Sequence, residues 1–216
     1  MKTKREKGFY EKYIKTPQDV ILAAVALFVL SPVLLLVAIF VRTQLGSPVI
    51  FKQKRAGKGG KPYYIYKFRS MSDARDANHN LLPDEQRIGR FGMLLRSTSL
   101  DELPTLWNVL RGDISLVGPR SLYLHYNNLY SEQQARRLEV RPGITGLAQI
   151  NGRNALCWEK RFEYDVYYVD HITFLGDWRI LIQTVGKVLK REGITSATSM
   201  TMEEFKGSKV EIAAHE

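Results

Sequence analysis

The sequence predicts a mainly helical α+β protein with a membrane anchor of two helices and a break between them. Three observations predict it: an uncharged apolar run over residues 20–41 that Ser31-Pro32 interrupts, two β-rich segments around a glycine-rich turn, and apolar stripes at helical spacing further along. Such stripes form a core or lie in a membrane interface. We therefore expect a re-entrant anchor, a small β-hairpin and amphipathic interfacial helices.

The run from Val20 to Val41 is the predicted anchor. Its 22 residues would form a helix about 33 Å long, enough for a bilayer core. Pro32 lacks an N–H and crowds the carbonyl of Phe28, so we expect a kink at which the Ser31 hydroxyl satisfies a freed carbonyl. Basic residues flank both ends, and the positive-inside rule then places both ends on the cytoplasmic face. A kinked spanning helix, a buried core helix and a signal peptide are the alternatives.

Local patterns predict the remaining elements. Residues 49–53 and 63–71 are β-rich and the cluster at 54–60 is turn-forming, which predicts a hairpin. The polar stretch at 72–86 predicts a loop. Helices are predicted where apolar residues recur every three or four positions, over 100–110, 158–169 and 177–191, the last ended by Gly193, with a short charged helix over 131–140.

The composition favours anionic partners. The 216 residues include 32 Lys and Arg against 22 Asp and Glu, a net charge of +10. This charge suits nucleic acid, acidic lipid headgroups or phosphorylated small molecules. Cys157 is the single cysteine, so an intrachain disulfide is impossible and a reducing compartment fits.

The densest cluster of reactive side chains lies between Arg96 and Arg120. Asp101 and Glu102 are adjacent carboxylates at a predicted helix start. Ser99-x-x-Glu102 fits a capping box, and acidic residues are common in a first helical turn. Capping is therefore the alternative to a chemical role for this pair.

Several segments in fixed order surround the pair and extend along the chain: Lys67-Phe68-Arg69-Ser70-Met71, Ser99-Leu100-Asp101-Glu102-Leu103-Pro104, Asn108-Val109-Leu110-x-Gly112-Asp113, Gly118-Pro119-Arg120, Arg141-Pro142-Gly143-Ile144-Thr145-Gly146, Gln149-x-Asn151-Gly152-Arg153 and Phe162-Glu163-Tyr164-Asp165-Val166-Tyr167-Tyr168. Together they resemble the bacterial sugar transferase family, the small monotopic polyprenyl-phosphate phosphoglycosyl transferases. The resemblance extends from about Tyr13 to Gly207 and includes the Ser31-Pro32 break. Ser121 departs from it, because the family usually has a second proline there; this loosens the turn after Arg120 and leaves its charge.

The resemblance implies a reaction and a place for it. Asp101 is expected to attack the β-phosphorus of a UDP-sugar, expected to be an N-acetylated amino sugar, with loss of UMP; polyprenyl (undecaprenyl) phosphate then takes the phosphosugar from Asp101. A Mg²⁺ ion held by Glu102 and Asp101 is expected to neutralise the diphosphate. The active site is expected at the cytoplasmic face of the bacterial inner membrane, for the first membrane step of glycoconjugate or polysaccharide assembly.

The resemblance also implies which side chains bind substrate, because arginine donors match phosphate oxygens. The expected phosphate ligands are Arg96, Arg120 and Arg153, with Lys67, Arg69 and Arg141 as further candidates. Each is alternatively a solvated surface charge. Asp165 is expected to contact the sugar, to orient an arginine or to form a salt bridge.

The expected organisation has three parts: a basic N-terminus with the anchor at 1–47, a catalytic domain at 48–195 and a polar tail at 196–216. Expected partners are a UDP-sugar, a polyprenyl phosphate, anionic membrane lipids and downstream glycosyltransferases, and not nucleic acid.

A basic, membrane-tethered nucleic-acid-binding protein is the main rival interpretation. The charge fits it, and residues 63–69 interleave aromatic and basic side chains as stacking surfaces do. It leaves the anchor and the Asp101-Glu102 context unexplained. Tight binding of single-stranded nucleic acid with a steep salt slope would favour this rival, whereas an inert membrane scaffold predicts no turnover.

Overall fold

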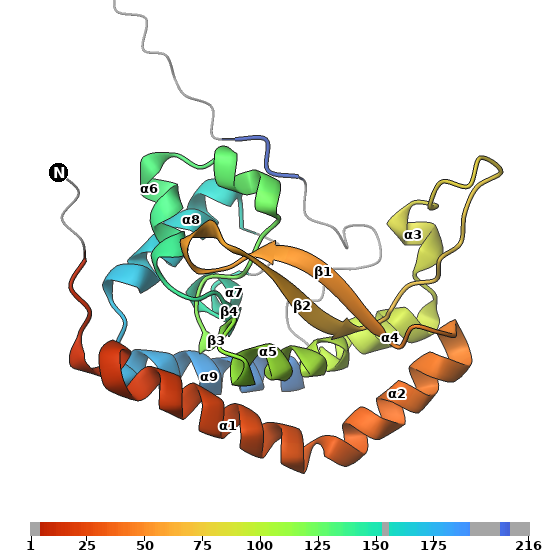
Figure 1. Cartoon of the computed structure of the whole chain (residues 1–216), viewed down its shortest axis with the longest axis horizontal. Coiled ribbons are helices and arrows are strands. Elements are labelled where there is room, and N and C mark those ends of the chain that lie inside the picture. Colours follow the sequence, from red (N-terminus) through yellow and green to blue (C-terminus); the bar gives the residue numbers. More distant parts are fainter. Residues whose placement is uncertain (1–4, 153–155, 191–203, 208–216) are drawn as a thin grey trace, which may run out of the picture.

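The structure is a computed structural model that describes residues 5–152, 156–190 and 204–207. It confirms a mainly helical α+β architecture with two small sheets. Figure 1 shows helices α1 and α2 as a wide V beneath the rest of the molecule, with α4, α5 and α9 lying above the opening of the V and the β1–β2 hairpin above α5.

The predicted break in the apolar run is confirmed. Helix α1 (Lys15–Val29), preceded by one π-helical turn η1 (Tyr10–Ile14), and helix α2 (Ser31–Leu45) meet at an angle of 64°. The Ser31 hydroxyl donates to the carbonyl of Phe28 over 2.7 Å, as expected. No helix in the described ranges is by itself long and apolar enough to cross a bilayer; the bent pair meets both criteria by length and composition. Insertion from one side stays a prediction.

Each arm of the V has one face in the protein core and one face exposed. Ala23 of α1 is buried with Leu106 and Val109, and Val37 and Val41 of α2 are buried with Phe68 and Leu95 of the domain above. The opposite faces expose large apolar side chains, of which Phe28 at the apex is 83% exposed. An apolar face left in water at this scale is typical of a membrane-contacting surface.

The hairpin is confirmed with shifted strand ends. Strands β1 (Ile50–Ala56) and β2 (Pro62–Phe68) pair antiparallel, with Arg55 opposite Tyr63. β1 therefore continues through residues predicted as turn, and β2 ends three residues before the predicted Met71. The turn lies where Gly59 and Gly60 take positive φ angles of 66° and 72°, which β-carbon-bearing residues avoid.

The second sheet brings two predicted motifs together. Strands β3 (Ser115–Val117) and β4 (Gly143–Thr145) pair in parallel, and Arg120 forms a further bridge to Gly143. The backbones approach so closely that a Cβ on Gly143 would lie 2.1 Å from the amide nitrogen of Gly118. Only glycine fits there, which explains why both motifs contain one.

The helices complete the element order. The predicted loop at 72–86 is irregular until α3 (Asp84–Arg87), and α4 (Arg90–Ser97) follows. The predicted helix over 131–140 is present as two short turns. The remaining short elements are η2 (Lys58–Gly60), η3 (Leu100–Thr105), α5 (Leu106–Leu110), η4 (Leu124–Asn128), α6 (Glu132–Ala135), η5 (Arg136–Glu139) and α7 (Leu147–Ile150).

The two long C-terminal helices are close to their predicted bounds. Helix α8 spans Trp158–Asp170, and α9 (Phe174–Leu189) begins three residues before the predicted Asp177 because the Thr173 hydroxyl accepts from the amide of Gly176. Gly193 lies outside the described residues. On α9 the outer face exposes apolar side chains, Leu175 at 77%, so the helix is amphipathic as predicted; its contact with a membrane stays a prediction.

The domain boundaries at 47, 48 and 195 also stay a prediction. One residue of the predicted polar tail is part of the core: Phe205 is buried, with its ring 5.0 Å from that of Phe162 and 5.7 Å from that of Tyr126. The tail segment 204–207 is therefore packed against α8 and η4.

Candidate active site

Asp101 and Glu102 lie on η3, a 3₁₀-helical segment that precedes α5, so the predicted single helix over 100–110 is two helices of different type. Pro104 has no N–H to donate within the segment. Ser99 adopts a left-handed conformation with φ 57° and ψ 16° and its side chain caps nothing. The capping box considered for Ser99 and Glu102 is therefore wrong, because the backbone at Ser99 has the wrong conformation for an N-cap. Non-glycine residues in this conformation are enriched at functional sites.

Glu102 joins two cationic side chains from distant parts of the sequence. Its Oε1 accepts from the Nζ of Lys67 over 2.6 Å and from the Nη2 of Arg120 over 2.8 Å. Lys67 lies on β2 and Arg120 follows β3. Burial alone would raise the pKa of Glu102, but the charges of Arg120 and Lys67 hold this pKa well below its usual range. Glu102 is thus a permanent anion at neutral pH.

Asp101 is the more basic carboxylate of the pair. Its side chain lies in a buried position, with 8% of the residue exposed. Burial first, and then the charge of Glu102, raise the pKa of Asp101 to about 6, against the opposing effect of Lys67, Arg96 and Arg120. At pH 7 about nine-tenths of such a group is ionised. The site therefore holds a desolvated carboxylate whose negative charge is available at neutral pH.

Arg96 approaches the same carboxylate from α4. Its Nε donates to the hydroxyl of Ser70 over 3.1 Å, which holds the side chain between the end of β2 and η3. Five of the residues predicted from the sequence therefore meet in one place: Lys67, Arg96, Asp101, Glu102 and Arg120.

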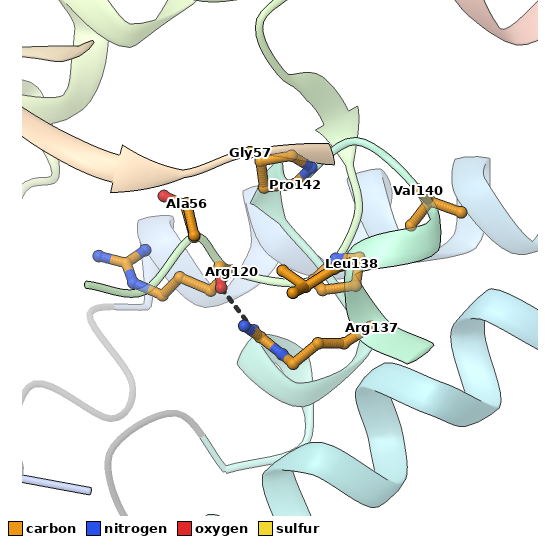
Figure 2. Close-up of a pocket in the computed structure, with 9 residues that line it drawn as sticks. Ala56, Gly57, Arg120, Arg137, Leu138, Val140 and Pro142 are labelled. Carbon is orange, nitrogen blue, oxygen red and sulfur yellow. Dashed lines mark hydrogen bonds between the residues drawn. The ribbon is translucent and has the colours of Figure 1, made fainter. Parts of the chain in front are cut away.

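The backbone of Arg120 is hydrogen-bonded to a buried ion pair. Figure 2 shows its side chain pointing away from Arg137, while its backbone carbonyl accepts from the Nη2 of Arg137 over 2.6 Å. Arg137 in turn donates from Nε and Nη2 to Oδ2 of Asp165, over 3.0 and 2.8 Å, and both side chains are buried. Of the alternatives for Asp165, the structure has it orienting an arginine, Arg137, in a salt bridge.

Arg69 lies outside this cluster. Its Nε donates to the carbonyl of Met71, its Nη1 to the carbonyl of Ser47 and its Nη2 to Asp73. With all three nitrogens bonded, Arg69 fixes the junction between α2, the hairpin and the following loop. These contacts favour the structural alternative for Arg69.

Arg141 and Arg153 also do not join the cluster. Arg141 donates from Nη2 to the hydroxyl of Thr16 over 2.9 Å and approaches Asp19 at 3.4 Å, both on α1. It therefore connects the loop before β4 to the anchor. Arg153 lies outside the described residues.

Comparison with known proteins shows the family of this chain. The family described as "Bacterial sugar transferase" matches residues 10–191. This chain belongs to the bacterial sugar transferase family. The family assignment favours the enzyme over the nucleic-acid-binding interpretation.

Several members of the family are similar over most of this chain. The uncharacterized sugar transferase EpsL of Bacillus subtilis is 57% identical over 187 residues, covering 86% of this chain and 93% of that protein. The UDP-glucose:undecaprenyl-phosphate glucose-1-phosphate transferase of Xanthomonas campestris is 40% identical, and the undecaprenyl-phosphate galactose phosphotransferase of Salmonella typhimurium 35% identical, covering 81% and 84% of this chain. The matches span only 38% and 42% of those two longer proteins.

Two residues of this sugar transferase support the site without being predicted. Asn108 is buried; its Oδ1 accepts from the amide of Tyr66, and its Nδ2 donates to the carbonyl of Tyr64 and to Asp113. It therefore fastens α5 to β2, which carries Lys67. The second residue is Arg137. Asn108 could have been found as part of the Asn108-to-Asp113 motif, whereas Arg137 lies in none of the motifs.

Proposed function

We propose that this chain transfers a sugar 1-phosphate from a UDP-sugar to a polyprenyl phosphate and releases UMP. Relatives named as undecaprenyl-phosphate glucose and galactose phosphotransferases support the reaction class. The observation that supports it best is the buried Asp101 carboxylate beside Glu102, Lys67, Arg96 and Arg120. A site with one basic carboxylate and three cations suits an electrophile that is itself a doubly charged diphosphate.

In the proposed first step, a carboxylate oxygen of Asp101 attacks the β-phosphorus of the UDP-sugar. The bond between that phosphorus and the oxygen bridging to the α-phosphorus breaks, and UMP leaves with its electron pair. In the second step an oxygen of the polyprenyl phosphate attacks the same phosphorus and the bond to Asp101 breaks. The carboxylate is regenerated, and the product is a polyprenyl diphosphate sugar. Covalent catalysis of this kind divides one difficult transfer into two easier ones.

The surrounding charges act on the transferring phosphoryl group. Arg96 and Arg120 offer planar donors that match phosphate oxygens, and Lys67 adds a third cation. Glu102 keeps Lys67 and Arg120 in place through its two hydrogen bonds. Asp101 is buried and the charged side chains around it are half-buried, so these charges act through a lower dielectric than water and need little reorganisation during the reaction.

The donor set suits Mg²⁺. Both hydrogen bonds to Glu102 reach Oε1, and among the described residues Oε2 has no hydrogen-bond donor. Together with Asp101 it supplies the few carboxylate oxygens that Mg²⁺ uses beside water and phosphate oxygens. Glu102 and Asp101 are therefore the proposed ligands, with water and phosphate oxygens completing the coordination; the described residues contain no group of three or more His, Cys, Asp or Glu side chains able to hold a metal. When bound, Mg²⁺ supplies charge neutralisation at the diphosphate.

The sugar and the location are further parts of the proposal. The sequence led to the expectation of an N-acetylated amino sugar, whereas the relatives named for a substrate use glucose or galactose. We place the enzyme in the inner membrane with its active site on the cytoplasmic face, where UDP-sugars and downstream glycosyltransferases are present. The bent helix pair supports this placement.

A donor panel tests the proposal. Purified full-length protein with undecaprenyl phosphate and Mg²⁺ is given UDP-glucose, UDP-galactose, UDP-N-acetylglucosamine or UDP-N-acetylgalactosamine. We expect UMP and a lipid-linked diphosphate sugar in equal amounts from at least one donor, and none from the Asp101→Asn protein. Production of UDP instead of UMP, or no product from any UDP-sugar, would contradict the proposal.

A further inference from the structure

A second polar hollow lies apart from the carboxylates, where several segments of the chain meet. It is about 70 Å³ in volume, and Val140 lines both this hollow and the smaller one drawn in Figure 2. The segment before α1, the first turn of α1, the hairpin turn η2 and the loop before β4 each contribute side chains. Its charged and hydroxyl-bearing lining residues are Lys7, Glu11, Lys15, Thr16, Lys58 and Arg141.

The hollow has an excess of positive charge. Lys15 is paired with the buried Asp177, and Glu11 is engaged by Arg5 at 2.5 Å. In the described ranges neither Lys7 nor Lys58 forms an ion pair. These two ammonium groups both line the hollow and lie close together: burial, and then the charge of Lys7, lower the pKa of Lys58. Glu11 opposes this effect on Lys58, but four cationic side chains and one carboxylate line the hollow, and this excess of positive charge favours an anionic ligand.

The walls of the hollow are fixed by hydrogen bonds, and those made by Asp177 and Tyr168 are buried. Asp177 of α9 accepts from the hydroxyls of Tyr10 and Tyr168, each over 2.8 Å, as well as from Lys15. The Tyr168 hydroxyl is also 3.0 Å from the carbonyl of Val117. On the other wall Arg141 is held by Thr16 at 2.9 Å. A ligand would therefore meet a preorganised site, which lowers the entropic cost of binding.

The position of the hollow along the anchor identifies the ligand class. Lys15 and Thr16 precede by one turn the uncharged run that begins at Val20. Just before them, Phe9 and Tyr13 are exposed at 71% and 55%, and exposed aromatic side chains beside an apolar helix are typical of the headgroup layer. The volume accommodates one tetrahedral anion, since a single water needs only about 10–15 Å³ in this measure.

We propose that this hollow binds the phosphate group of an anionic phospholipid, with Lys7, Lys58 and Arg141 as its ligands. A phosphate bridging Lys7 and Lys58 ties the hairpin turn to the segment before α1. The headgroup then fixes the depth at which α1 enters the membrane. This site is separate from Asp101, so it does not depend on the proposed transfer reaction.

A thermal-shift titration tests the site. Full-length protein in an uncharged detergent receives dioctanoyl phosphatidylglycerol, dioctanoylglycerol as the headgroup-free control, or inorganic phosphate at constant ionic strength. We expect phosphatidylglycerol to raise the Tm by several degrees. The Lys7→Gln/Lys58→Gln protein should lose at least about tenfold in apparent affinity. The matched Lys52→Gln/Lys54→Gln protein, which loses the same charge from exposed positions on β1, should keep wild-type affinity.

The results of the titration decide whether the hollow binds phosphate and from which source. A shift with inorganic phosphate as well as with the lipid would support the site and show that the phosphate group alone suffices; a shift with the lipid alone would support a headgroup source. No shift with either ligand, or the same loss in both double variants, would overturn the proposal.

Chemical labelling of lysines tests the same site in the unsubstituted protein. Because the pKa of Lys58 is lowered, acetic anhydride should modify it faster than Lys54 at neutral pH. Phosphatidylglycerol should protect Lys7 and Lys58 selectively, and unchanged labelling of both would contradict binding in the hollow.

Discussion

At the scale of one residue, Asp101 is a buried carboxylate that costs the folded protein stability at neutral pH. Its pKa of about 6 in the folded chain exceeds that of an exposed aspartate, so the folded protein binds a proton more tightly than the unfolded chain between about pH 4 and pH 6. The stability associated with this group is present below pH 4 and is lost as pH rises through 6. Ionised Asp101 is therefore a destabilising group at neutral pH.

Replacing Asp101 by Asn should consequently stabilise the protein while abolishing turnover. The expected gain is on the order of 2 kcal/mol at pH 7.5, because the amide carries no charge to desolvate. Thermal unfolding in detergent should show a Tm raised by several degrees at pH 7.5 and by almost nothing at pH 4. The exposed Glu85→Gln serves as the control. A Tm of the Asp101 variant that is lower at both pH values would contradict the electrostatic account.

The same group sets an expected pH profile. If Asp101 must be ionised to attack, kcat/KM should fall about tenfold per pH unit below pH 6. Arg96 opposes the rise in this pKa, so Arg96→Gln should move the acidic limb toward higher pH as well as weaken donor binding. Initial rates of UMP release between pH 4.5 and 8 provide the measurement. If the acidic limb of the pH profile stays at the same pH in the Arg96 variant, Arg96 does not influence the pKa of Asp101.

The residues of the site could be predicted from the sequence, but the contacts that hold them in place could not. Lys67, Arg96, Asp101, Glu102 and Arg120 all lie in recognisable motifs. Arg137 acts on the backbone carbonyl of Arg120, an interaction for which no side-chain pattern exists. The capping box failed for a related reason: Ser99 and Glu102 have the right spacing, but the left-handed backbone at Ser99 depends on the tertiary structure around it.

At the scale of elements, the α1–α2 break makes a prediction about topology. With Cys157 replaced by Ser, since it is an exposed free cysteine, Glu6→Cys and Ser47→Cys should both be labelled from the cytoplasmic face by a membrane-impermeant maleimide. Pro32→Leu restores a backbone donor and removes the ring, which should straighten the pair and move one label to the other face. Labels on opposite faces of the protein with Pro32 intact would contradict single-sided insertion.

The link between α8 and the Arg120 segment yields a stability prediction. Asp165→Asn leaves Arg137 buried without its counter-ion and should cost about 3–5 kcal/mol. The double variant Arg137→Met/Asp165→Leu should recover most of that stability, because an apolar pair of similar size fills the same space. It should still lose activity, since the carbonyl of Arg120 is no longer held. Recovery of both stability and kcat would show that the ion pair does not position Arg120.

Elements were predictable where the sequence has local signals. The Ser31-Pro32 break, the hairpin and α8 follow from proline, glycine and apolar spacing. The exact strand ends could not be predicted, because Lys54 and Arg55 are compatible with either a turn or an exposed strand. Their pairing with Tyr64 and Tyr63 places them in the strand. The 3₁₀ form of η3 was missed because its apolar spacing resembles that of an α-helix.

At the scale of the whole molecule, the fold gathers charges that the sequence separates. Lys67 and Glu102 are 35 residues apart, and Arg137 and Asp165 are 28 apart. The close glycine contact between β3 and β4 and the clamp of Asn108 on β2 set these distances. The V of α1 and α2 lies beneath them (Figure 1), and its outer apolar side chains are exposed. A charged site above an apolar anchor suits a soluble phosphorylated donor and a lipid acceptor, and such long-range geometry is beyond local sequence patterns.

A burst of UMP in the absence of lipid tests most directly whether Asp101 forms a covalent bond to the phosphosugar. Full-length enzyme with Mg²⁺ and its UDP-sugar, but without polyprenyl phosphate, should release close to one equivalent of UMP per enzyme. Mass spectrometry of the quenched protein should find the phosphosugar on the peptide that contains Asp101, and the Asp101→Asn protein should give neither. No UMP before the lipid is added, together with intersecting double-reciprocal plots when both substrates are varied, would instead indicate direct transfer in a ternary complex and contradict the account.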